Sequence, residues 1–149
     1  MKNLFDAVAA SEILNRLEKL YPDTQPLWGK MKISQMMAHC QVPLQVALGE
    51  KQLKRNLIGI LFGGMARRQL TKETDFKKNL PTAPQFIVKD ERQFDNEKQQ
   101  LQSLIQQFST ADANEIASRS HPFFGKMTKE EWGILQWKHL DHHFRQFGV

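Results

Sequence analysis

Cysteine is nearly absent from this sequence, because Cys40 is the only one among 149 residues. A single thiol excludes an internal disulfide and suits a reducing compartment. Long apolar runs are also missing: the longest, residues 57–65, is far shorter than the ~20 residues that a helix needs to cross a bilayer. Asp6 and Glu12 interrupt the N-terminal segment before the apolar core of a signal peptide is complete. We therefore expect a cytoplasmic protein with no membrane partner.

Alternating patterns typical of β-strands are scarce too, and no strand or hairpin is predicted. Apolar residues instead recur at intervals of three and four, which is the period of an amphipathic α-helix. This period predicts helices over residues 6–20, 34–48, 56–70, 91–108 and 128–147. Two long connections separate them, residues 71–90 and 109–127. The pattern favours an all-α fold, a helix bundle in a single domain of residues 1–149.

Local residues mark several features of these helices. Gly49 is suited to the left-handed position that follows the second helix. Thr128, with Glu131 three residues later, forms a capping box that opens the last helix. Pro43 lies inside the second helix and removes one backbone donor, so we expect a kink or loosened hydrogen bonding one turn earlier, near His39.

Positive charge is concentrated in one part of the chain. Residues 51–78 hold eight lysines and arginines against two acids and carry +6, which leaves −1 for the remainder of a chain of net charge +5. This segment is either an ordinary solvated surface or a region that attracts an anionic small-molecule substrate. Nucleic acid is not an expected partner, because no aromatic stacking platform or DNA-reading motif accompanies the charge.

Histidines cluster near the C-terminus. The chain has five, and His139, His142 and His143 fall within a single turn and a half of the last predicted helix. His139 and His143 are four residues apart, so their Cβ atoms lie about 5–6 Å from each other on one face, a spacing that can hold one metal ion. His142 lies at the edge of the same face. A surface pair that binds nothing is the ordinary alternative for such a spacing.

The surroundings of this pair favour a metal site. Trp132, Leu135 and Gln146 extend the same stripe, so the two imidazoles are predicted to be buried, where unpaired polar groups are costly. Catalytic zinc sites commonly use three protein ligands. His39, on the second helix, is the natural third ligand, although a histidine there could also be a packed core residue.

The segments "PLWGKMKISQMMAHC" and "HPFFGKMTKEEWGILQWKHLDHHFRQFG" resemble the DinB/YfiT-like superfamily of bacterial metalloenzymes. The resemblance rests on the steps between His139, His142, His143 and Gln146 in the last helix. It implies a DinB-like four-helix bundle with long inter-helix connections. It also implies that His39, His139 and His143 bind a divalent ion, most often zinc or nickel.

The activity implied by the resemblance is broad. Relatives include metal-dependent hydrolases and thiol-dependent S-transferases, so a small anionic or thiol-containing substrate is expected and the catalytic residues are left unassigned. A non-catalytic metal-sensing or partner-binding bundle is the alternative, and a homodimer is compatible with either function. Residues 71–90 are predicted to lie over the mouth of the metal site or against a subunit partner.

Four further residues are candidates for supporting the metal or contacting substrate. His121 precedes Pro122 and serves either as an acid–base group or as a loop histidine that bonds the backbone. Asp141 is either an acceptor for an imidazole N–H or a solvated carboxylate. His142 is expected to be a spectator or to support a ligand, and Gln146 either bonds metal-bound water or caps the helix end.

Overall fold

The computed structural model of the protein describes residues 1–55, 57–72, 74–80 and 84–149. Within these residues the chain is predominantly helical, as the sequence predicts. Its elements are α1 (Ala7–Glu18), α2 (Ile33–Leu48), α3 (Leu57–Leu70), the 3-10 turn η1 (Pro84–Phe86), α4 (Phe94–Thr110), α5 (Ala113–Ser118), β1 (Ser120–His121), β2 (Gly125–Lys126) and α6 (Lys129–Gln146).

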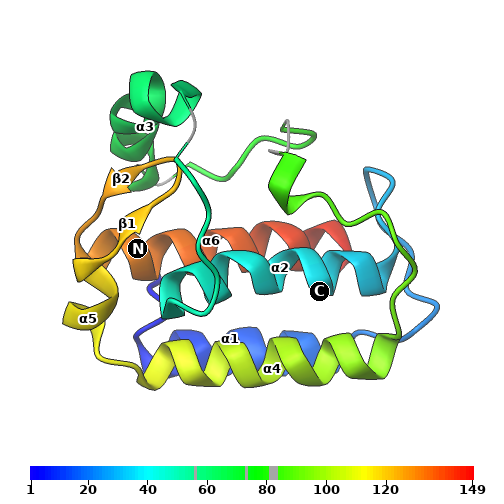
Figure 1. Cartoon of the computed structure of the whole chain (residues 1–149). Coiled ribbons are helices and arrows are strands. Elements are labelled where there is room, and N and C mark those ends of the chain that lie inside the picture. The colour runs from blue at the N-terminus through cyan, green and yellow to red at the C-terminus, as the bar shows by residue number, and fades with distance from the viewer. Residues whose placement is uncertain (56, 73, 81–83) are drawn as a thin grey trace.

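Four of the long helices pack against one another. Helices α1 and α2 each contact both α4 and α6, so the apolar core lies between these four elements. Figure 1 shows α1 and α4 side by side along one side of the molecule, with α2 and α6 along the other. Helix α3 and the small β-hairpin lie together at one end and contact α6 through α3. No helix in the described part of the chain combines the length and apolar character needed to cross a bilayer.

The helix ends follow from local side-chain chemistry. The carboxylate of Asp6 accepts hydrogen bonds from the Val8 and Ala9 amides and begins α1. The predicted capping box of Thr128 and Glu131 is present at the start of α6. Gly49 ends α2 in the left-handed conformation, with φ of 81°, as predicted. Pro43 lies inside α2 and, having no N–H, leaves the His39 carbonyl without its helical donor.

The prediction of no strands is wrong at one place. Residues 120–126 form a hairpin in which Ser120 pairs with Lys126 and His121 with Gly125. Each strand has only two residues, too few for an alternating pattern to be recognised. Gly125 takes a positive φ of 74° and allows the chain to turn.

Two smaller predictions also need correction. Helix α4 begins at Phe94 rather than at residue 91, because Gln93 is extended and Arg92 is paired with Asp90 ahead of the helix. The helical period of residues 6–20 also predicts Val8 on the apolar stripe of the first helix, but Val8 is 78% exposed. The predicted start of the third helix at Asn56 lies outside the described residues, as do parts of the 71–90 connection.

The core excludes a role for the only thiol. Cys40 is fully buried on α2 beside Met36, and burial raises the pKa of its thiol well above the usual range. The thiol is therefore a small packing group rather than a nucleophile.

Candidate metal centre

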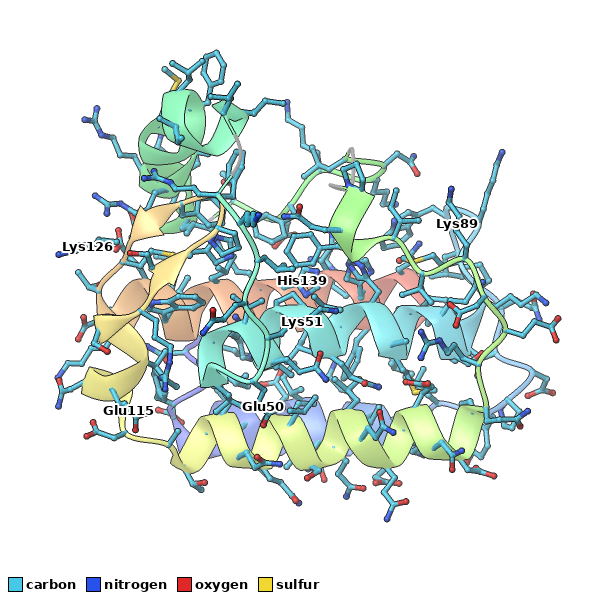
Figure 2. The ribbon with its side chains drawn as sticks, viewed as in Figure 1. Glu50, Lys51, Lys89, Glu115, Lys126 and His139 are labelled. Atoms are coloured by element: carbon cyan, nitrogen blue, oxygen red, sulfur yellow. The ribbon has the colours of Figure 1, made fainter. Side chains whose placement is uncertain are left out.

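Three histidines from two helices meet in the interior. His39 on α2 and His139 and His143 on α6 each offer a ring nitrogen, and these atoms all lie within 4.8 Å of one another. The ring centroids form a nearly equilateral triangle, with sides of 5.0 Å for His39–His139 and 4.7 Å for each of the other pairs. Figure 2 shows His139 in the middle of the molecule, over α6 and α2. The packing of α2 against α6 therefore brings together the three histidines that the sequence predicts as metal ligands.

The spacing suits a shared cation. Two nitrogen ligands of a tetrahedral zinc ion, each about 2.0–2.1 Å from the metal, lie about 3.3 Å apart. His39 Nε2 and His139 Nε2 are 3.1 Å apart, close to this value. One of the three nitrogen pairs thus has the separation that a small divalent ion requires, and all three nitrogens lie close enough that the residues present could hold such an ion.

The orientation of His39 is fixed by the long connection between α3 and α4. Its Nδ1 lies 2.8 Å from the carbonyl oxygen of Phe86, in the η1 turn. A carbonyl can only accept, so Nδ1 carries the proton and Nε2 presents its lone pair to the cluster. This is the usual arrangement around metal-binding histidines, in which a second acceptor selects the tautomer.

Gln146 fixes the ring of His143 in the same way. The amide nitrogen of Gln146 donates to the Trp28 carbonyl at 2.7 Å, which leaves its oxygen to accept from His143 Nδ1 at 2.9 Å. The neighbouring Gly29 has φ of 80°, and a Cβ at that position would lie 2.6 Å from the Gln146 amide nitrogen. Glycine is therefore required for this approach. Gln146 therefore orients the His143 ring, a contact that neither of its predicted roles includes.

The environment keeps the cluster neutral near pH 7. Burial lowers the pKa of His39, and burial together with the neighbouring His39 lowers that of His143 to about 3. The pKa of His139 falls well below its ordinary value, first through burial and then through repulsion from the other imidazoles. Neutral imidazoles are the form that binds metal.

His142 faces away from the triangle. Its ring packs edge-on against Trp28 and Phe76, at centroid distances of 5.8 and 6.1 Å. Burial lowers its pKa first, and the nearby Arg145 cation lowers it further. The His142 ring lies 5.1 Å from that of His143, so it separates the cluster from the surface on this side.

A pocket of about 230 Å³ lies next to His142. Its lining combines three cations, two acids and three rings: Trp28, Asp75, Phe76, Lys78, Lys138, Asp141, His142 and Arg145. Lys78 is placed over the Trp28 ring at 4.4 Å. Lys138 donates to the carbonyls of Leu70, Lys72 and Thr74 and so holds the start of the 71–90 connection against α6.

The described part of the 71–90 connection thus covers the histidines. Phe76 packs on His142, and the Phe86 carbonyl binds His39. The prediction that this segment lies over the site agrees with these contacts. This segment contacts His39 through a backbone carbonyl, and such a contact cannot be predicted from the type of residue that carries it.

The other two candidates lie outside the cluster. His121 is in the hairpin, where its Nδ1 accepts from the Phe123 and Phe124 amides, and burial lowers its pKa to about 4. Asp141 pairs with Arg16 of α1 at 2.7 Å and binds no imidazole among the described residues. His121 therefore organises a turn, and Asp141 joins α6 to α1.

Several residues at the site were missed by the sequence reading. Trp28 supplies both a carbonyl for Gln146 and a ring for the pocket, and its neighbouring Gly29 was the only available signal. Lys138 reads as one more surface cation, yet burial lowers its pKa and three carbonyls surround it. The Phe86 carbonyl has no sequence signal at all.

Fold and site together define a helical protein with a largely buried three-histidine cluster between two of its long helices. The family model described as "Protein of unknown function (DUF1569)" matches residues 3–148, and the chain belongs to this family. No curated protein and no solved structure matches the chain significantly.

Proposed function

We propose that this protein is a DinB-like metalloprotein that binds one divalent ion, zinc or nickel, through His39, His139 and His143. The ion would serve a hydrolase or a thiol-dependent S-transferase reaction on a small substrate. The mutual packing of α1, α2, α4 and α6 supports a four-helix bundle of the DinB type.

One observation carries the proposal. The three imidazoles converge on one point, and two of them have their Nδ1 atoms occupied by the Phe86 carbonyl and the Gln146 amide oxygen. Both rings are thereby turned with Nε2 inward, and burial keeps them neutral. A bound ion would satisfy the buried lone pairs that His39 and His143 direct inward, and His139 would complete the set with its own proton moved to Nδ1.

When bound, a divalent ion supplies Lewis acidity that activates water or a substrate thiol. The chain itself supplies the substrate environment. Lys78, Lys138 and Arg145 give the neighbouring pocket a positive lining that suits an anionic substrate. Half-buried His142 lies between this pocket and His143, and because its pKa is lowered its ring is neutral near pH 7 and could accept a proton there.

Metal content tests the proposal. Wild type and His139→Ala would be purified without chelator, reloaded with zinc or nickel, desalted and measured by elemental mass spectrometry. We expect about one ion per wild-type chain and much less in the variant. Equal, near-zero metal in both proteins would refute the site. Screening the loaded wild type against ester, amide and thiol-transfer substrates then distinguishes an enzyme from a non-catalytic metal sensor.

A further inference from the structure

Helix α3 presents its large apolar side chains to solvent. Half of the large hydrophobic residues that are exposed in the described chain lie within residues 57–65 of this helix: Leu57, Ile58, Ile60, Leu61, Phe62 and Met65. Leu61, at the centre of this surface, is 73% exposed. Figure 2 shows the side chains of α3 extending away from the rest of the molecule. We call this set of residues the α3 apolar face.

The opposite face of α3 is made of glycine. Gly59 and Gly63 are buried, and a Cβ at Gly63 would lie only 2.0 Å from the Phe123 carbonyl oxygen of the hairpin. The helix therefore approaches the hairpin closely through its smallest residues and directs its largest ones outward. This is the reverse of an ordinary surface helix, whose apolar stripe faces the core. A contiguous apolar surface of this kind indicates a binding face.

Cations border the α3 apolar face at both ends. Lys51, Lys54 and Arg55 precede the helix, Arg68 lies in its last turn and Lys72 follows it. All five residues are exposed. A second copy of the chain would bring this positive border against its own like charge. An anionic surface would complement it.

The dimensions of α3 suit one kind of anionic surface. Its 14 residues extend about 21 Å, less than the ~30 Å hydrocarbon core of a bilayer, so the helix can lie in the interface but cannot span it. Lysine and arginine beside such a helix keep their charges among lipid headgroups while the apolar residues enter the acyl boundary. We propose that α3 docks the protein on an anionic lipid surface. The proposal is independent of the metal site.

Vesicle flotation tests it. The wild-type chain would be mixed with extruded vesicles of phosphatidylcholine alone, or of phosphatidylcholine with 30% phosphatidylglycerol. We expect wild type to float with the anionic vesicles, and Leu61→Asp to lower its partition coefficient at least tenfold. Val8→Asp is the matched control, because Val8 is equally exposed but lies on α1, remote from α3. It should bind as wild type does.

Charge and self-association provide the second arm. Lys54→Glu with Arg68→Glu should weaken binding to anionic vesicles severalfold, and raising the salt concentration should weaken wild-type binding in the same direction. If wild type does not float with the anionic vesicles at low salt, the proposal is overturned. It is also overturned if Leu61→Asp floats to the same extent as wild type. Sedimentation velocity without lipid should show a monomer. A wild-type dimer that Leu61→Asp dissociates would identify a second copy as the occupant and also overturn it.

Discussion

At the scale of single residues, the contacts of each imidazole show which histidines point into the cluster better than their spacing in the sequence does. His39 and His143 each have Nδ1 engaged, by Phe86 and by Gln146, whereas His142 interacts with Trp28 and Phe76 on the pocket side. Spacing along α6 allowed either His142 or His143 to join His139. The structure assigns the inward position to His143.

The zinc affinities of variants at His142 and His143 should differ. His143→Ala removes a ligand and should weaken zinc binding at least tenfold, whereas His142→Ala should have a much smaller effect because its ring faces the pocket. Isothermal titration of both variants against wild type measures the difference. A larger loss for His142→Ala would show that the wrong histidine has been assigned.

His121 should make folding stability depend on pH. Its folded pKa of about 4 lies below the ordinary 6.5, so the unfolded chain binds the proton first and stability falls as pH drops through this window. His121→Asn keeps an acceptor for the two turn amides but cannot titrate. Between pH 7 and pH 5, wild type should lose roughly 2 kcal/mol more unfolding free energy than the variant.

Urea denaturation at the two pH values checks this prediction. The comparison uses the difference between the proteins, because the other buried histidines titrate in both. Parallel losses in wild type and His121→Asn would mean that His121 is protonated in the folded state and makes no such contribution.

At the level of elements, the sequence predicts helices through their ends. Asp6, Gly49 and Thr128 act through the backbone groups beside them, so α1, α2 and α6 begin or end near the expected residues. The hairpin at residues 120–126 depends on contacts with α3 and on the turn at His121, which no local pattern encodes. The sequence also does not predict which side of α3 faces solvent. A continuous apolar run has no polar side, and its orientation is set only by the packing of its glycines against the hairpin.

Adjacent glycines in α3 should respond oppositely to one methyl group. Gly63→Ala would force its Cβ against the Phe123 carbonyl and should separate α3 from the hairpin, which destabilises this region. Gly64 has no atom within 4 Å of an added Cβ, so Gly64→Ala should stabilise the helix by up to about 1 kcal/mol. Hydrogen exchange of the α3 amides, faster in the first variant and slower in the second, checks the pair.

The same hydrogen-exchange measurement also tests whether α3 packs against the hairpin through Gly63. Equal exchange in Gly63→Ala and wild type would mean that α3 does not contact the hairpin through its glycine face, and the outward direction of Leu61 would then lose its basis.

For the molecule as a whole, the site joins parts of the chain that are 100 residues apart, in the pair His39 and His139. Such a contact cannot be derived from periodicity, which describes single helices. The sequence suggested the pairing through the need for a third ligand and through the family resemblance. The covering segment, with its Phe86 carbonyl, followed from neither.

Metal should therefore stabilise the entire fold. Zinc at a hundredfold excess over its Kd adds about 2.7 kcal/mol to the unfolding free energy, which raises Tm by roughly 5–10 °C in a domain of this size. His39→Ala, which removes the proposed ligand on α2, should abolish most of this shift. Differential scanning calorimetry with zinc and with magnesium measures it, and magnesium, which prefers oxygen ligands, should have no effect. A zinc shift retained in His39→Ala would place the ion elsewhere.

The contact between His39 and His139 has a consequence for where protons reside. His39 holds its own proton on Nδ1, so the proton between the two Nε2 atoms belongs to His139, whose Nδ1 is buried without a partner among the described residues. A cation held by Nε2 of His139 would displace that proton, and the neutral ring would then carry its proton on Nδ1. Gln136, three residues earlier on α6, has a buried amide oxygen that also lacks a partner in the described part of the chain. Under the proposed metal site, cation uptake would therefore exchange one tautomer of His139 for the other within a largely buried cluster.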